Sequence, residues 1–123
     1  MEDKIIDFYK GYEGEREIHF IRLLKDGSKK TIKMWDGHYS DFMEQNEPEP
    51  GAKEWTSLAL HYHTTTDDWE PWEIPNLIEA LQQLRRININ KLRFAETSVV
   101  LKEICNLLAE AIENQERVLI VED

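Results

Sequence analysis

The side chains that could do chemistry gather in one stretch of the chain, from residue 61 to residue 73. His61 and His63 alternate along a run of β-type residues, so their imidazoles share one face of a strand. Two imidazoles and a carboxylate form a ligand set for zinc or iron. Asp67 and Asp68 follow, but no second ligand pair and no HExxH-type motif accompanies them. We therefore favour a polar strand face and assign no metal ligand. A small metal-dependent enzyme using the two histidines is kept as an alternative.

No residue is assigned a catalytic role. Adjacent Asp67 and Asp68 point apart on an extended backbone, which suits a turn better than a paired acid–base site. Cys105 falls on the apolar face of a predicted helix, where a thiol is usually an inert small hydrophobe. The sequence holds no phosphate loop, no GxGxxG motif and no nucleophile elbow. We expect a protein that is not an enzyme and that uses no cofactor.

Residues 66–75, here called the Trp-acid segment, suit binding better than catalysis. They contain four acids, two tryptophans and two prolines, with no Lys or Arg. Tryptophan is favoured at contact surfaces, and carboxylates beside it suit a basic partner. The prolines restrict the backbone, which would partly pre-shape such a surface. The predicted partner-binding residues of this segment are Asp67, Asp68, Trp69, Glu70, Trp72 and Glu73.

The negative charge of the chain is localised. There are 25 acids and 15 bases, for a net charge of −10. Residues 36–54 carry six acids and one base, and residues 67–79 carry five acids and no base. The charges of these two segments add up to the whole net charge, which indicates a directional field and not a role in solubility alone. A solvated acidic face is the alternative. The first segment is expected to extend the contact surface through Asp41, Glu44, Glu47 and Glu49.

A chain of this charge repels a polyanion, so we expect no direct contact with nucleic acid. The basic strip of Arg85, Arg86, Lys91 and Arg93 is instead expected to complete a helix dipole and to pair with nearby acids. A DNA-mimic inhibitor of a nucleic-acid-binding protein is a second alternative. Its case is weaker because tryptophan and proline interrupt the acidic clusters.

Length and composition indicate one globular α+β domain over residues 1–123. The chain has 123 residues, of which 41% are hydrophobic and 33% charged. Its apolar runs are shorter than a membrane span, its N-terminus lacks signal-peptide character, and its one cysteine fits a reducing compartment. We expect a cytoplasmic protein without a membrane partner.

The local patterns predict a small antiparallel sheet, a hairpin plus further strands, with helices packed on one face. A hairpin is predicted at residues 17–24 and 29–35, because the Asp26–Gly27 pair between them favours a tight turn. Ile32 and Met34 mark its apolar face. Further strands are predicted at residues 55–63 and 117–121, the second beside the hairpin, with an exposed loop at 46–51.

Four helices are predicted by apolar spacing and capping residues. The first spans residues 3–12. The second, over residues 39–45, follows a turn at 36–38 and uses Ser40 as its N-cap. The third begins near Pro75, with acids near its start, and the fourth begins at Thr97 or Ser98. The predicted core faces of the last two helices are Leu77, Ile78, Ala80, Leu81 and Leu84, and Val100, Leu101, Ile104, Cys105, Leu107, Leu108, Ala111 and Ile112.

The run from Trp69 to Pro75, the helix through Leu84 and the following Ile87–Leu92 run resemble immunity proteins of bacterial contact-dependent growth inhibition systems. The likeness covers roughly residues 55–112. It implies a small cytoplasmic protein that binds the C-terminal toxin domain of its cognate system. Many such toxins are nucleases with basic clefts, so the resemblance implies neutralisation by occluding the cleft or a nearby surface. It carries over no set of functional residues, because each immunity protein fits its own toxin.

Overall fold

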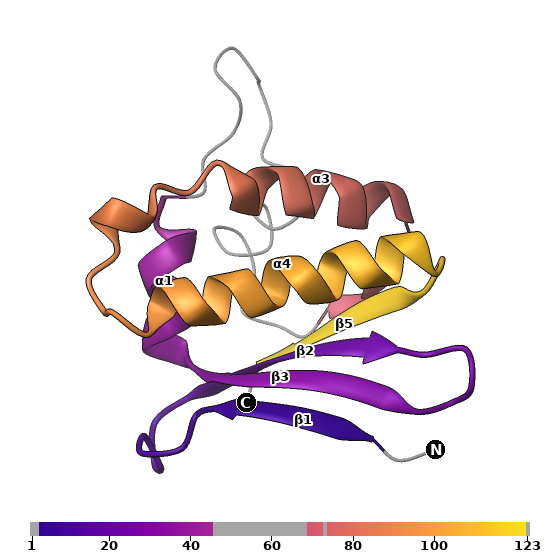
Figure 1. Cartoon of the computed structure of the whole chain (residues 1–123). Helices are drawn as coiled ribbons and strands as arrows, with labels where there is room; N and C mark the ends of the chain where they lie inside the picture. The colour runs from indigo at the N-terminus through magenta and orange to yellow at the C-terminus, as the bar shows by residue number, and fades with distance from the viewer. Residues whose placement is uncertain (1–2, 46–68, 73, 123) are drawn as a thin grey trace.

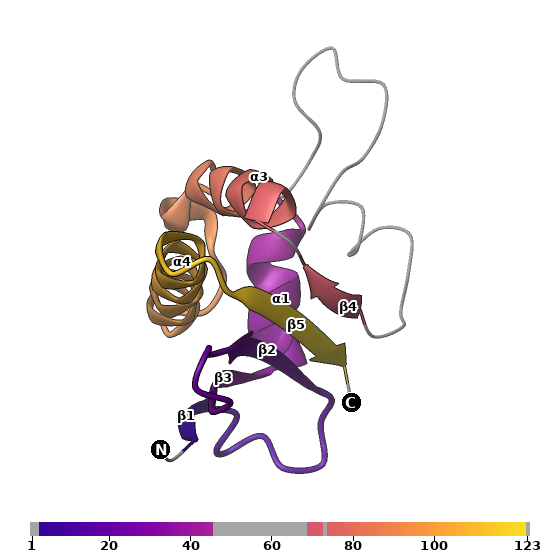
Figure 2. The same ribbon diagram turned by 90° about the vertical axis from the view of Figure 1, so that its right-hand side faces the viewer.

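The chain folds into two layers, a sheet and a set of helices that cover one of its faces (Figure 1). A computed structural model describes residues 3–45, 69–72 and 74–122. The described elements in chain order are β1 (Lys4–Phe8), β2 (Glu17–Leu23), β3 (Lys29–Trp35), α1 (Asp36–Met43), β4 (Trp69–Trp72), α3 (Ile74–Arg85), the 3-10 turn η1 (Ile89–Lys91), α4 (Thr97–Glu113) and β5 (Arg117–Glu122). The predicted α+β class, with helices on one face of the sheet, is confirmed (Figure 2).

The sheet has five strands in the order β1-β3-β2-β5-β4. Strands β2 and β3 form the predicted antiparallel hairpin, and β5 pairs antiparallel with β2 as expected for the end of the chain. Gly27 has a φ of 90°, which the turn requires and which glycine adopts without strain. The carboxylate of Asp26 accepts a hydrogen bond from the Ser28 backbone N–H at 2.8 Å. The Asp-Gly signal was therefore a correct guide to this turn.

The helix predicted over residues 3–12 is wrong, because residues 4–8 form strand β1. It pairs in parallel with β3, with Ile6 opposite Ile32, so the sheet is mixed and not wholly antiparallel. Ile6 and Phe8 are partly buried against the core and Ile5 is exposed, which is the alternation of a strand. Sheet pairing with a segment about 26 positions away in sequence therefore overrides the local helical spacing.

Helix α1 begins three residues earlier than predicted. The expected turn at residues 36–38 is its first turn, and Trp35, not Ser40, occupies the N-cap position, without a side-chain cap. The Asp36 backbone N–H donates instead to the carbonyl of Arg16 at 2.9 Å. The chain thus passes from β3 into α1 without a loop.

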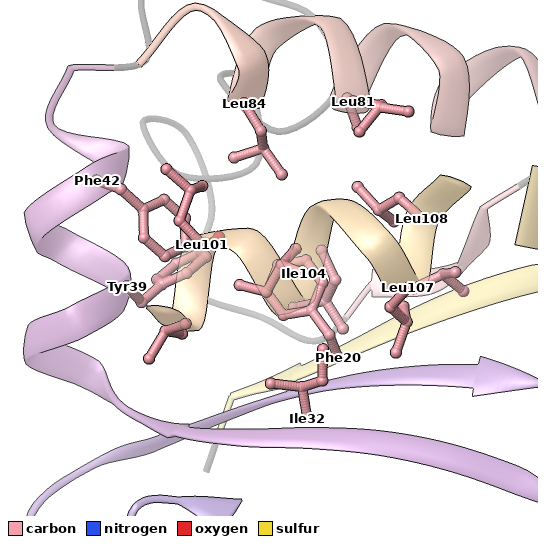
Figure 3. Close-up of a cluster of buried hydrophobic side chains, with 14 of the residues drawn as sticks. Phe20, Ile32, Tyr39, Phe42, Leu81, Leu84, Leu101, Ile104, Leu107 and Leu108 are labelled. Carbon is pink, nitrogen blue, oxygen red and sulfur yellow. The ribbon is translucent and has the colours of Figure 1, made fainter. Parts of the chain in front are cut away.

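The core lies between the sheet and helices α1, α3 and α4. Phe20 and Ile32 rise from the sheet toward Ile104 of α4, while Leu84 of α3 closes the cluster from above (Figure 3). Most predicted core positions of α3 and α4 are buried, as are Ile32 and Met34. Cys105 and Ile112 are only partly buried, and Ile78 is a wrong prediction because 43% of it is exposed.

The helix ends were predicted less well than their faces. Pro75 lies in the first turn of α3 and Arg85 in its last, as expected, but the described first turn has no acid because Glu79 comes later. Glu96 occupies the N-cap position of α4, and neither Thr97 nor Ser98 caps it. None of the described helices has the length and apolar character needed to cross a membrane. The predicted loop at 46–51 and strand at 55–63 lie outside the described residues.

Candidate functional site

Part of the Trp-acid segment forms an outer strand of the sheet. Strand β4 pairs antiparallel with β5, with Trp69 opposite Ile120 and Trp72 opposite Val118. Three residue steps on β4 therefore match two on β5, which is the geometry of a β-bulge. Pro71 falls within this irregular stretch, and an outer strand tolerates a residue that lacks a backbone N–H. The sequence patterns did not predict this strand, because proline and acidic residues are rare in strands.

Half of the residues in the predicted contact surface lie outside the described part of the chain. Asp67, Asp68 and Glu73, like Glu47 and Glu49 of the second acidic region, lie outside the described residues. The backbone of β4 places Trp69, Glu70 and Trp72 at the sheet edge. The structure therefore places the backbone of part of the segment in the fold.

Asp41, predicted to extend the acidic surface, is instead buried, and we correct that expectation. It is 3% exposed, and its carboxylate accepts hydrogen bonds from the backbone N–H groups of Arg93 and Phe94 at 2.9–3.0 Å. Burial alone would raise the pKa of Asp41, but these bonds and one from the Thr97 hydroxyl outweigh it and lower the pKa. Asp41 thus holds the chain after η1 and is not available to a partner.

Glu44 remains at the surface but is already paired. Its carboxylate lies 3.0 Å from an Arg93 guanidinium nitrogen, and both side chains are more than half exposed. Such a pair contributes less than about 1 kcal/mol to stability, so a partner could displace it at small cost. Arg93 also reaches Asp41 at 3.5 Å, in line with the expectation that this base pairs with nearby acids.

His38 belongs to a cluster of rings that the sequence did not reveal. The ring is fully buried, and the rings of Tyr12, Trp35 and Phe94 contact it edge to face. Its Nδ1 lies 2.8 Å from the Thr97 hydroxyl, and burial lowers the pKa of the imidazole. Trp35 is half-buried and stacks on Tyr12 with 4.3 Å between ring centroids. The cluster has the features of a structural packing contact, not of an accessible reaction centre.

The metal hypothesis gains no ligand from the described part of the chain. Within residues 3–45, 69–72 and 74–122, no group of three or more His, Cys, Asp or Glu side chains could hold an ion. His61 and His63 lie outside those ranges. Cys105 is partly buried and burial raises its pKa, which accords with the expected inert thiol.

The fold and this edge define a small α+β protein whose acid- and tryptophan-rich segment borders its sheet. No protein-family model, curated protein or solved structure matches the chain.

Proposed function

We propose that this chain is an immunity protein that acts in the cytoplasm and neutralises a cognate bacterial toxin domain by binding it. The Trp-acid segment would provide the contact surface. The observation that carries the proposal is the place of β4 in the sheet. Strand β4 is an outer strand, and among the described strands it has a neighbour, β5, on one side only. An acid-rich segment at a sheet edge can meet a partner with both its backbone and its side chains.

Charge supports a basic partner. Residues 67–79 carry five acids and no base, and the chain as a whole carries −10. A basic nuclease cleft and an acidic surface attract one another over about 8–10 Å in physiological salt. Such attraction raises association rates by orders of magnitude and disfavours uncharged competitors. An inhibitor that must capture a toxin before it acts benefits from that speed.

The two tryptophans would supply binding energy that charge alone cannot. Tryptophan is enriched among interface residues whose truncation costs more than about 2 kcal/mol. Trp69 and Trp72 flank the bulged stretch of β4, beside the acidic residues of the segment. In this proposal the acids speed association and the tryptophans slow dissociation. Removing an acid should therefore lower the association rate, whereas removing a tryptophan should raise the dissociation rate.

Growth protection tests this function. If a secreted protein is encoded directly upstream of this chain, its C-terminal domain, expressed inside a susceptible bacterium, is the probe. Co-expression of this chain should restore growth, and the Trp69→Ala/Trp72→Ala variant should lose protection while remaining folded. Lack of protection by the wild-type chain, together with no binding to the purified domain, would overturn the proposal.

A matched reversal tests the role of charge. Asp68→Lys lies in the Trp-acid segment, whereas Glu15→Lys makes the same charge change at an exposed residue in the loop before β2. Asp68→Lys should weaken protection and Glu15→Lys should not. Equal effects of the two would mean that net charge, not this segment, matters.

A further inference from the structure

A groove between α3 and α4 is not used by the proposed contact surface. It has a volume of about 490 Å³ and is lined by Leu84, Arg85, Ile87, Ile89, Ser98, Val99, Leu101, Lys102 and Cys105. Ile89 is 58% exposed and Val99 is 50% exposed, so apolar walls face solvent here. Leu84 and Leu101 also line the groove, and both are buried. The size falls within the range of small-molecule sites and is small for a docked helix.

The charged groups of the groove are all positive. Arg85 comes from the last turn of α3 and Lys102 from α4, and no acid is among the described residues that line the groove. Neither cation forms an ion pair with any other residue in the described part of the chain. Two cations that have no ion pair among the described residues and lie beside apolar walls are unexpected in a chain of charge −10. An anionic group bound there could interact with both cations without displacing a partner from the described residues.

The remaining polar groups of the groove narrow the class of ligand. The Ser98 hydroxyl already donates to the Ala95 carbonyl at 3.1 Å, so it is not a spare donor. The Cys105 thiol is a weak hydrogen-bonding group, and Arg85 is close enough to act on its pKa, against the larger effect of burial. We therefore expect a ligand that has one anionic group and an apolar chain.

We propose that the α3–α4 groove binds a small amphiphilic monocarboxylate, with its apolar chain against Ile89, Val99 and Leu101 and its carboxylate between Arg85 and Lys102. This site is independent of the proposed toxin contact, because it lies on the helical layer whereas β4 is an outer strand of the sheet. Each methylene that the groove covers fully should tighten binding by about fourfold, and less where it stays half exposed.

Cys105 gives a direct readout because it is the only cysteine of the chain and lines the groove. Octanoate and decanoate, below their aggregation concentrations, should slow its alkylation by iodoacetamide in a saturable way. Decanoate should bind about two- to fourfold tighter per added methylene than octanoate. Decanol and decyltrimethylammonium, which share the apolar chain but not the anion, should protect at least about fivefold less well.

Substitutions at exposed residues test the cations and the apolar wall of the groove separately. Lys102→Gln and Arg85→Gln should each weaken decanoate binding about two- to fivefold while leaving decanol unchanged. Val99→Asp should abolish protection, because it places a negative charge in the groove that repels the carboxylate of the ligand. Lys10→Gln, an exposed residue after β1, is the matched control and should change nothing.

Methyl NMR shifts of Ile89 and Val99 on decanoate addition provide a second readout that does not use the thiol. The proposal is overturned if decanoate neither protects Cys105 nor shifts these methyl groups. It is equally overturned if the trimethylammonium compound protects as well as decanoate, since the cations would then play no part.

Discussion

His38 Nδ1 lies 2.8 Å from Thr97 Oγ1 and thereby joins helix α1 to the first residue of α4. The Thr97 hydroxyl donates to the carboxylate of Asp41, so its oxygen accepts from His38 and we assign the Nδ1–H tautomer. The other ring nitrogen, Nε2, is buried and has no hydrogen-bond partner in the described structure. It lies 3.7 Å from Glu96 Oε1. In the buried chain His38–Thr97–Asp41 the imidazole donates from Nδ1, and burial favours its neutral form by lowering the pKa of His38.

Stability should fall when the pH drops through the ordinary titration range of histidine. Burial lowers the pKa of His38 below its ordinary value of 6.5, so below that pH the unfolded chain binds a proton that the folded chain resists. The stabilisation that comes from a neutral His38 is fully present above about pH 6.5 and is lost as the pH falls. The limiting slope for one proton is about 1.4 kcal/mol per pH unit. Urea unfolding between pH 8 and pH 5 measures it.

His38→Asn isolates this effect from the other histidines. An asparagine amide can replace the Nδ1–H donor to Thr97 but does not titrate. The variant should be less stable at pH 8, because a smaller side chain leaves a cavity, yet its stability should vary less between pH 6.5 and pH 5. An unchanged pH slope would contradict the assignment of the titration to His38.

Gly37→Ala should destabilise the fold although glycine is a poor helix former. A Cβ at Gly37 would lie 2.3 Å from a ring carbon of Trp35. Helix propensity alone favours alanine by about 1 kcal/mol, whereas displacing the packed ring costs about 1–3 kcal/mol. Unfolding free energy and tryptophan fluorescence should both change. Ser40→Ala in the same helix is the control, because Ser40 caps nothing, and it should stay within about 0.5 kcal/mol of wild type.

Arg22 ties β2 to the region where α4 passes into β5, through two glutamates of different burial. Its Nε lies 2.6 Å from Glu116, whose side chain is 6% exposed, and its Nη1 lies 2.5 Å from Glu110, which is 44% exposed. Glu116→Ala leaves a buried guanidinium without its buried partner and should cost about 3 kcal/mol. Glu110→Ala should cost less than about 1 kcal/mol. Similar losses in thermal or urea unfolding would contradict this ranking.

Asp41→Asn should loosen the chain after η1. The carboxylate of Asp41 accepts from both Arg93 and Phe94 N–H, and an amide oxygen accepts less strongly. We expect a loss of roughly 2 kcal/mol and faster hydrogen exchange at those two amides. In wild type the same bonds should weaken as the pH falls through the lowered pKa of Asp41, below about 3.8. Glu44→Gln, at the exposed pair with Arg93, should leave both amides protected.

Local signals in the sequence predicted the elements whose causes are local. The Asp26–Gly27 turn fixed the hairpin, and apolar spacing predicted the buried faces of α3 and α4. Strand β1 was missed because its pairing with β3 depends on a distant segment. The start of α1 was missed because Trp35 covers Gly37 and the helix continues directly from β3.

The candidate site was predicted only in outline for the same reason. Asp41 and Glu44 are identical in charge and close in sequence, yet one is buried and the other exposed. The difference in burial arises because the backbone N–H groups of Arg93 and Phe94, 52 and 53 positions later in the chain, donate to the Asp41 carboxylate. Nor could composition show that the middle of the Trp-acid segment is a bulged outer strand, since that depends on where β5 runs.

The association rate of this protein with the purified cognate toxin domain tests the central claim most directly. Stopped-flow measurement over a range of ionic strength should show a wild-type rate that falls steeply with added salt. The Asp67→Lys/Asp68→Lys variant should associate about tenfold more slowly at low salt and with a flatter salt dependence. If this reversal leaves both the rate and its salt dependence unchanged, and Trp69→Ala leaves dissociation unchanged, the Trp-acid segment is not the contact surface.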